Sequence, residues 1–248
     1  MFILDNLTKT YFHRSEPVHA LDAVRLTIPQ GSFLAVTGGS GSGKTTLLLM
    51  LGGLIRPTSG TVTFKGADLF GLASAQLAEY RNRTVGFVLQ TFNLVPYLTA
   101  LENVMVPMLL TATSATDRRN RAETLLTQMD LAHRMDFFPR ELSIGQQQRV
   151  AIARALANDP KVILADEPTG NLDPSLAAEI LDILEGLNRE DGRTVVMVTH
   201  NPQAARRAQT VLQLCEGRIL AEESVAPDGA NVAPETVGGT ARRVNESD

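Results

Sequence analysis

Residues 33–51 read FLAVTGGSGSGKTTLLLML, and this stretch decides the fold. Its middle part, from Gly38 to Thr45, matches the pattern G-x-x-x-x-G-K-[S/T] without a mismatch. The apolar residues 33–37 predict a buried strand, and residues 46–51 predict a helix. A glycine-rich segment between a strand and a helix is the setting in which this pattern forms a phosphate-binding loop, or P-loop.

The residue types of this loop suit a polyphosphate. Glycines let backbone N–H groups turn toward the phosphates, and the helix N-terminus adds partial positive charge. Lys44 can reach the β- and γ-phosphates, and the Thr45 hydroxyl can bind Mg²⁺. A plain Gly/Ser connector before a core helix is the alternative, which the full match in its context disfavours. We expect phosphate contacts from Gly38, Gly39, Ser40, Gly41, Ser42, Gly43, Lys44, Thr45 and Thr46.

The bulk properties narrow the classes of protein. A chain of 248 residues with 44% hydrophobic residues can bury a core in one large domain or two small ones. The net charge of −4 argues against a general nucleic-acid surface, so we expect no nucleic-acid partner. The single cysteine, Cys215, excludes an internal disulfide framework, fits a reducing compartment and is expected in the core.

The N-terminus and the apolar runs predict no membrane crossing. The first residues lack the basic and apolar regions of a signal peptide. The longest apolar run, residues 47–55, is interrupted by Gly52 and Gly53 and falls short of the roughly 20 residues that a spanning helix needs.

The order of elements predicts an α/β fold. Apolar and alternating runs predict strands at residues 2–4, 24–28, 61–64, 85–89, 162–165, 194–199 and 211–214. Helical patterns run from about 98 to 135, from 145 to about 158 and at about 175–187, with a short helix after residue 200. We expect a core with a parallel sheet, an antiparallel β layer at the front and a helical insert at about 95–157. Residues 224–248 have the composition of a disordered tail that follows a domain at 1–223.

Two carboxylates follow the strand predicted at 162–165. Asp166 at the strand end would hold Mg²⁺, directly or through water, and Glu167 could polarise a water for attack on the γ-phosphate. Ordinary surface acids at the end of a buried strand are the alternative, which a P-loop in the same chain disfavours.

Residues 142–149 read LSIGQQQR and precede an apolar helix at 150–156. The stretch resembles the signature motif of ABC-transporter ATPases, usually Leu-Ser-Gly-Gly-Gln. The resemblance covers roughly residues 2–222 in the order of the family. Its further motifs are the adenine-stacking aromatic at Tyr11, the Q-loop glutamine at Gln90, the D-loop at Asn171-Leu172-Asp173 and the switch histidine at His200.

This resemblance implies an ATP-hydrolysing, Mg²⁺-dependent enzyme with a P-loop NTPase core and a helical subdomain that carries the signature. Two copies would face each other head to tail, each ATP lying between the P-loop of one copy and the signature of the other. Asp173 and the signature residues Ser143, Gly145 and Gln146 would bind nucleotide. Lys44, Gln90, Glu167 and His200 would be catalytic, and Thr45, Gln90 and Asp166 would surround the metal.

Ile144 departs from the family pattern, because glycine is usual at this position of the signature. A β-branched residue is strongly disfavoured at φ > 0. We therefore expect residue 144 to have an ordinary negative φ and the site to remain active.

Two of the matched residues have plain structural alternatives. His200 follows the strand at 194–199, where a histidine could cap a helix or pack in the core, whereas the resemblance implies a hydrogen bond to the γ-phosphate. Tyr11 could be an ordinary strand aromatic, whereas the resemblance implies stacking on adenine, which would affect affinity more than turnover.

The segment after Gln90 is apolar and aromatic. These residues could belong to the core or line the groove that receives a coupling helix of a membrane permease. We expect a mixture, with Phe92, Leu94 and Tyr97 toward the groove and Leu101 and Val104 inward. Together with residues 166–173, this segment looks most like the lipoprotein-release and macrolide-exporter subfamily.

The sequence therefore predicts the ATPase subunit of an ABC transporter, bound to a permease at the cytoplasmic face of the membrane. One alternative is a nucleic-acid-associated ATPase of the same superfamily, but the single motif set, the absence of a long coiled-coil insert and the acidic charge disfavour it. A second is an ATPase that regulates a membrane-bound activator of a cell-wall enzyme without transport. A GTPase is disfavoured because no Asn-Lys-x-Asp motif is present.

Overall fold

The computed structural model describes residues 1–14 and 16–225. Its strands form two sheets, one of four strands in the order β2-β1-β4-β5 and one of six in the order β10-β9-β3-β8-β7-β6. The strands of the smaller sheet are β1 (Phe2–His13), β2 (Glu16–Ile28), β4 (Ser59–Phe64) and β5 (Ala67–Asp68). Those of the larger are β3 (Phe33–Thr37), β6 (Val85–Leu89), β7 (Val162–Asp166), β8 (Thr194–Val198), β9 (Thr210–Cys215) and β10 (Arg218–Ser224).

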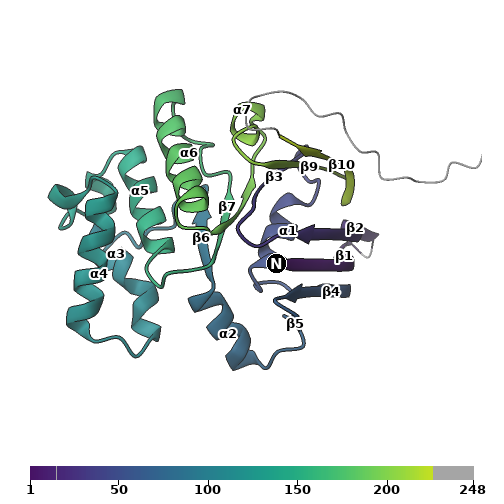
Figure 1. Cartoon of the computed structure of the whole chain (residues 1–248), viewed down its shortest axis with the longest axis horizontal. Coiled ribbons are helices and arrows are strands. Elements are labelled where there is room, and N and C mark those ends of the chain that lie inside the picture. The colour runs from purple at the N-terminus through teal and green to yellow at the C-terminus, as the bar shows by residue number, and fades with distance from the viewer. Residues whose placement is uncertain (15, 226–248) are drawn as a thin grey trace, which may run out of the picture.

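The helices gather mainly on one side of the larger sheet. They are α1 (Lys44–Leu51), α2 (Ser74–Arg83), α3 (Ala100–Met105), α4 (Ala115–Gln128), α5 (Ile144–Ala155), α6 (Pro174–Arg189) and α7 (Pro202–Ala205). Short 3₁₀ turns are η1 (Val106–Leu110), η2 (Ala132–Arg134) and η3 (Pro139–Glu141). Helices α3, α4 and α5 lie far from the antiparallel sheet of β1, β2 and β4 (Figure 1). The predicted fold class, a P-loop core with a parallel sheet, an antiparallel β part and a helical part, is confirmed.

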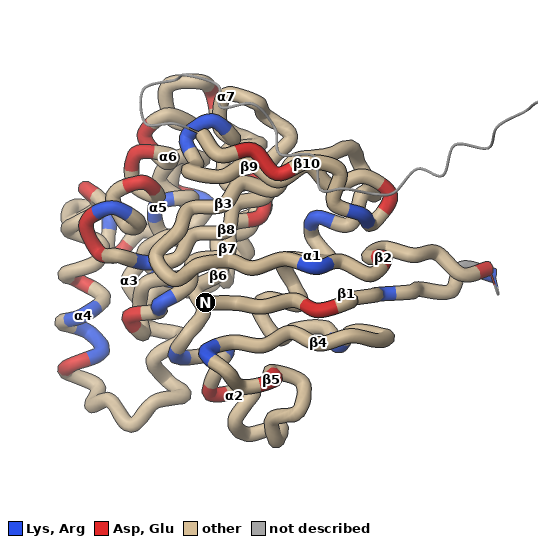
Figure 2. The backbone as a smooth tube through the Cα atoms, turned by 45° about the vertical axis from the view of Figure 1, so that its right-hand side comes forward, with Lys and Arg blue, Asp and Glu red and all other residues tan. Residues whose placement is uncertain are grey.

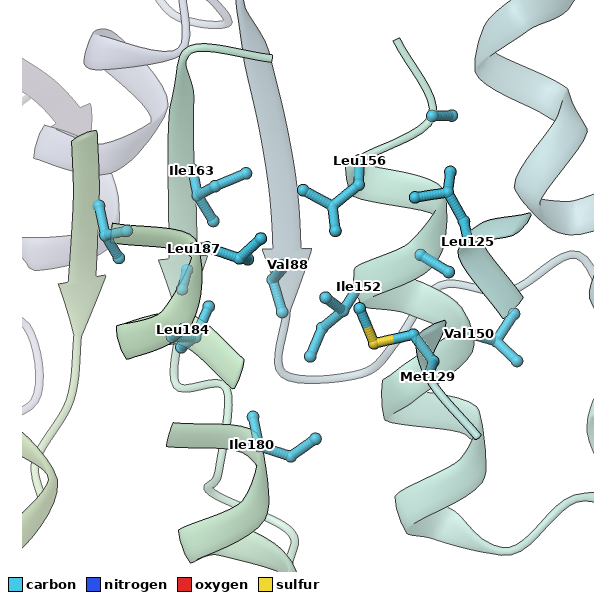
Figure 3. Close-up of a cluster of buried hydrophobic side chains, with 14 of the residues drawn as sticks. Val88, Leu125, Met129, Val150, Ile152, Leu156, Ile163, Ile180, Leu184 and Leu187 are labelled. Carbon is cyan, nitrogen blue, oxygen red and sulfur yellow. The ribbon is translucent and has the colours of Figure 1, made fainter. Parts of the chain in front are cut away.

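The central strands are buried on both faces, which explains their continuous apolar sequences. In β7, Ile163 and Ala165 join the core beneath the helices, whereas Val162 and Leu164 join the core shared with α1 and the antiparallel sheet. The same alternation runs through β3 and β8. Figure 3 shows the core beneath the helices, called the helical-side core below, in which residues of α5 and α6 converge on the sheet.

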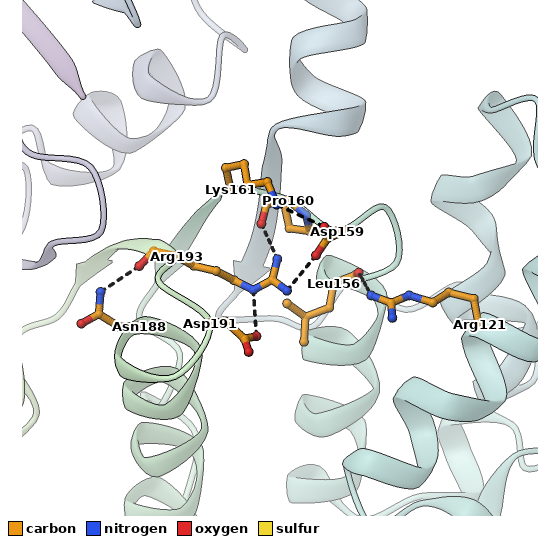
Figure 4. Close-up of polar contacts among 8 residues, drawn as sticks. All are labelled: Arg121, Leu156, Asp159, Pro160, Lys161, Asn188, Asp191 and Arg193. Atoms are coloured by element: carbon orange, nitrogen blue, oxygen red, sulfur yellow. Dashed lines mark hydrogen bonds and ion pairs between the residues drawn. The ribbon is translucent and has the colours of Figure 1, made fainter.

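Arg193 ties the amino ends of two central strands together. Its guanidinium donates to the Asp159 carboxylate at 2.8 Å, to Asp191 at 3.1 Å and to the carbonyl of Pro160 (Figure 4). Asp159 and Pro160 lie just before β7, and Arg193 precedes β8. This network fixes the amino ends of these strands. The sequence motifs follow the opposite, carboxyl ends.

Several predicted elements differ from those observed. The continuous helical pattern at 98–135 is broken into α3, η1 and α4, because Pro107 lacks the N–H that a continuing helix needs. Strands β1 and β2 are longer than predicted, and α2, β5 and β10 were not predicted. Ser224 belongs to β10, and residues 226–248 of the predicted tail lie outside the described residues.

The prediction of a buried Cys215 is wrong, because its side chain is exposed at the end of β9.

Within the described residues, no helix is long and apolar enough to cross a membrane. Basic and acidic residues are mixed along α4 rather than separated into patches (Figure 2).

Candidate nucleotide-binding and hydrolysis site

Four adjacent parallel strands bring the predicted motifs to one edge of the sheet. β3, β8, β7 and β6 are neighbours in this order, and all pair in parallel. Their carboxyl ends are followed by the P-loop, His200, Glu167 and Gln90 respectively. Ligand sites of α/β sheets form at the carboxyl edge. Motifs separated by more than a hundred residues therefore meet because of strand direction and order.

The P-loop needs glycine at two points of close approach. Gly43, which precedes α1, has φ 103°, and a Cβ there would lie 2.0 Å from the carbonyl oxygen of Ala20. A Cβ at Gly38 would lie 2.1 Å from the carbonyl oxygen of Leu214. Strands β2 and β9 thus press directly on the loop, and a side chain at either position would displace it.

The Lys44 ammonium lies over the loop. It donates to the carbonyl oxygens of Gly38 at 3.0 Å and Gly39 at 2.7 Å. The positive charge is therefore held at the loop by two carbonyl oxygens.

The two oxygen ligands predicted for a metal ion lie side by side. The Thr45 hydroxyl is 3.1 Å and 3.3 Å from the two carboxylate oxygens of Asp166 and donates to them. Burial raises the pKa of Asp166 above its ordinary value, while the bond from Thr45 opposes this shift. The ionised carboxylate that a cation requires is thus lost at a higher pH than for an exposed aspartate.

Glu167 and His200 form a polar pair beside this site. His200 Nδ1 lies 2.9 Å from Glu167 Oε1, and the His200 backbone N–H donates to Oε2 at 3.4 Å. The Glu167 side chain is 15% exposed and the His200 side chain 69%. Glu167 has φ 47°, an uncommon value for a residue with a side chain, which is compatible with a functional constraint.

Gln90 faces the segment that follows Glu167. Its Nε2 would lie 3.1 Å from a Cβ at Gly170, and its carbonyl oxygen accepts a hydrogen bond from Asn171 at 3.1 Å. The structure therefore brings Gln90, Glu167, His200, Asp166 and the P-loop into one region. Asp173, in contrast, uses its carboxylate to cap α6, accepting from the N–H groups of residues 175 and 176.

The signature stretch begins α5 and lies apart from the P-loop. Ser143 caps the helix, accepting from the Gln146 N–H at 3.3 Å, while Gln146 Oε1 accepts from the Ser143 N–H at 3.0 Å. A Cβ at Gly145 would lie 3.0 Å from two carbons of Leu176, so glycine allows α5 to approach α6. None of the hydrogen bonds among residues 1–14 and 16–225 joins the signature residues to the P-loop.

Ile144 has the negative φ that the sequence predicts. It is the first residue of α5 and is not among the residues with positive φ. Its side chain is 51% exposed, so it neither strains the backbone nor fills the core.

Tyr11 lies on the long β1–β2 hairpin, apart from the pair of carboxylates. Its side chain is 44% exposed, and Lys9 Nζ lies 5.1 Å from its ring centroid. Strand β2 of the same hairpin contacts the P-loop at Ala20. An aromatic ring is thus available on an element that touches the loop.

The sequence prediction missed Arg154 at the end of α5. Its guanidinium donates to the carbonyl oxygens of Phe92 and Asn93, both at 2.6 Å, and so holds the segment after Gln90. Phe92 and Asn93 both have positive φ. The signal was present in the sequence, because a lone arginine in the apolar run 150–156 requires polar partners when the helix is buried.

The segment after Gln90 was predicted to be partly core and partly the lining of a groove for a permease helix. Leu101 and Val104 are buried as expected, and Tyr97 is 77% exposed. Phe92 is partly buried, and Leu94 packs against the helical-side core.

Comparisons with known proteins identify the family of this chain. A family model described as ABC transporter matches residues 21–170. The lipoprotein-releasing system ATP-binding protein LolD of Geobacter metallireducens is 47% identical over 217 residues, covering 88% of this chain and 96% of that protein. The macrolide export ATP-binding/permease protein MacB of Syntrophobacter fumaroxidans is 45% identical, covering 93% of this chain and 32% of that protein.

A solved structure is also similar over nearly its whole length. The dimeric post-hydrolysis state of the ATP-binding cassette MJ0796 of Methanocaldococcus jannaschii, bound to ADP and Pi, is 44% identical, with a TM-score of 0.85. The match covers 91% of this chain and 99% of that one. The family resemblance predicted from the motifs is confirmed: this chain belongs to the ABC transporter family.

Proposed function

We propose that two copies of this ATP-hydrolysing subunit enclose two ATP molecules, each held by the P-loop of one copy and the signature of the other. The observation that carries this proposal is that the helix N-termini at the P-loop and at the signature belong to helices packed in different cores of the chain. The P-loop precedes α1, and Ser143 precedes α5 beside the helical core. The similar cassette MJ0796 has a dimeric structure with bound ADP and Pi, which supports a dimer of this chain. If each ATP were bound by only one of these helix N-termini, the other N-terminus would have no ligand.

Thr45 and Asp166 fit a magnesium ion. A hydroxyl and a carboxylate are oxygen ligands of the kind that Mg²⁺ uses together with substrate phosphates. When bound, the ion would supply charge neutralisation at the β- and γ-phosphate oxygens. Gln90, at the end of the adjacent strand, is the third residue that we assign to this site.

Glu167 is the general base in this proposal, and His200 orients its carboxylate. A base must lie within hydrogen-bond reach of the water whose proton it accepts. The 2.9 Å contact with His200 and the 15% exposure hold Glu167 in one place beside the P-loop edge. Lys44 would supply positive charge to the γ-phosphate as negative charge develops there.

The oligomeric state tests the shared site. We expect the Glu167→Gln variant to be a dimer with ATP and Mg²⁺ and a monomer without nucleotide, measured by light scattering after size exclusion. Ser143→Arg in the same background places a bulky cation at the capping position and should abolish the dimer while each copy still binds ATP. A monomer under all conditions, with ATP bound, would contradict the shared site.

We infer that the partner of this dimer is a membrane permease and that the subunit binds peripherally at the cytoplasmic face. The names of the lipoprotein-releasing and macrolide-export relatives support a permease partner and this subfamily. The exposed Tyr97, on the segment after Gln90, provides an apolar surface for a permease helix. Copurification with an integral-membrane permease from detergent-solubilised membranes tests this assignment. Stimulation of a cell-wall hydrolase by that complex, without a transported molecule, would favour the regulatory alternative.

Replacing Ile144 by glycine should change the rate of ATP hydrolysis by less than tenfold. The helical backbone and the exposed side chain indicate that the natural residue does not distort the signature. Glycine at the first helical turn removes a side chain but no hydrogen bond. The measurement is the steady-state rate of both proteins at saturating ATP, with Ser143→Ala as a variant that removes a cap. A gain above tenfold in Ile144→Gly would mean that the natural signature is impaired.

Replacing Tyr11 by alanine should raise the Kd for ATP by about two- to tenfold, because aromatic stacking contributes about 0.5–1.5 kcal/mol beyond burial. The rate at saturating ATP should stay the same. Phe12→Ala is the matched control, because Phe12 is the next residue of β1 and is 74% exposed. Equilibrium binding of a fluorescent ATP analogue measures both. An equal loss in the two variants would indicate a general effect on the hairpin.

A further inference from the structure

Gln148 places a fully buried amide on the signature helix. Its side chain is 0% exposed, in contrast to the half-exposed Ile144 one turn earlier. It lies three residues after Gly145, on the face of α5 that packs against the start of α6. Buried amides require hydrogen-bond partners, so the contacts of this side chain define what it does.

The hydrogen-bond partner of the Gln148 amide determines which side its NH₂ group faces. Its Nε2 lies 2.7 Å from the carbonyl oxygen of Pro168, which can only accept, so the NH₂ group must face it. The other atom of the amide, Oε1, has no hydrogen-bond partner in the part of the chain that the structure describes. A buried acceptor without a partner destabilises the folded state. The amide thus satisfies the carbonyl of Pro168, and only one of its two polar atoms has a partner among the described residues.

Pro168 directly follows Glu167, whose backbone is in the left-handed region. A residue with a side chain keeps φ 47° only where its surroundings hold it. One restraint is the bond from the Glu167 N–H to the Val198 carbonyl at 2.9 Å, and another is the bond from the Gly170 N–H to the Glu167 carbonyl at 3.1 Å. These two come from β8 and from the loop itself. Pro168 has no N–H. Its carbonyl oxygen is therefore the one backbone group of this residue that can form a hydrogen bond.

We propose that Gln148 is a positioning residue that couples the signature helix to the Glu167 carboxylate through the carbonyl of Pro168. The proposal rests on the role of Glu167 as general base. The bond joins the helix whose N-terminus carries Ser143 to the peptide that follows the base. A shift of α5 is therefore transmitted to the backbone of Glu167. The signature would in this way influence the hydrolytic geometry of its own copy, in addition to binding nucleotide in the other.

The test is Gln148→Met, which keeps the length of the side chain and removes the donor. We expect kcat to fall by about tenfold or more, because a small misplacement of a catalytic group is costly in rate. We expect the Kd for ATP to stay within about twofold and Tm to change little, because the unpaired Oε1 is removed while the Pro168 carbonyl loses its donor. Gln148→Leu provides a second apolar replacement with a different shape.

A double-mutant comparison separates positioning from an independent effect. In the Glu167→Gln background, Gln148→Met should cause no further loss in single-turnover rate, because residues that act through one another are not additive. Asn188→Leu is the matched control. Its buried amide also donates to backbone carbonyls, those of Gly31 at 2.8 Å and Arg193 at 2.7 Å, but at the opposite edge of the sheet. It should lower Tm without changing kcat of the folded protein.

The possible outcomes test the positioning role of Gln148 and the general-base role of Glu167 separately. Wild-type kcat in Gln148→Met or Gln148→Leu would overturn the positioning role, and so would a full additive loss in the Glu167→Gln background. A large fall in Tm for both variants would assign Gln148 to stability and also overturn it. A wild-type rate in Glu167→Gln alone would overturn the general base instead, whatever the result at Gln148.

Discussion

Glu167→Gln is expected to lower kcat for ATP hydrolysis by about 10²- to 10⁴-fold, the range in which a general base contributes. Glutamine has nearly the same shape, and its amide can still contact His200, but it cannot accept a proton from water. The backbone restraints on residue 167 involve its N–H and carbonyl, so they survive the substitution. The Kd for ATP should therefore change by less than about threefold.

Single-turnover hydrolysis with excess protein measures this effect, and equilibrium binding measures the Kd. Glu190→Gln is the matched control, because Glu190 is exposed at the C-terminal end of α6, away from the carboxyl edge of the sheet. It should hydrolyse ATP at the wild-type rate. If Glu167→Gln also keeps the wild-type rate, Glu167 does not accept the proton, and its contact with His200 is structural.

The core of the fold could be predicted because its signals are local. The strands at 33–37, 162–165 and 194–199 are apolar apart from threonines at their ends, since both faces are covered, and each is followed by a polar or glycine-rich motif. Parallel pairing then places those motifs at one edge. Family resemblance supplied the roles of Gln90, Ser143 and Tyr11, which residue spacing alone would not have given.

The remaining features depend on distant contacts. α2 has a polar sequence with few buried residues, Leu77 and Tyr80, so its pattern is weak. Cys215 was expected in the core because it lies in a late strand, but the alternation of that strand places it on the exposed face after the buried Leu214. The left-handed backbone of Glu167 and the hydrogen bond from Gln148 to the Pro168 carbonyl involve residues that no sequence period relates. Such contacts become visible only when α5 is packed against the loop after β7.

Lys44→Ala is expected to weaken ATP binding by about 100-fold or more. Hydrogen bonds to charged groups contribute about 1.5–3 kcal/mol each, and the ammonium can form two or more with phosphate oxygens. In the structure the ammonium lies over the loop, at 2.7 Å from the Gly39 carbonyl. Its removal therefore deletes a positive charge held at the loop that the sequence pattern assigns to phosphate.

Lys161→Ala is the control that separates this local effect from the loss of one positive charge. Lys161 lies just before β7, at the amino end of the strand whose carboxyl end carries Asp166, and it pairs with Asp159 on the surface. Isothermal titration of both variants with Mg·ATP should give near wild-type affinity for Lys161→Ala and a large loss for Lys44→Ala. A loss of affinity without a comparable fall in Tm places the effect at the phosphates. Equal affinities in the two variants would mean that the backbone N–H groups of the loop hold the triphosphate without the ammonium.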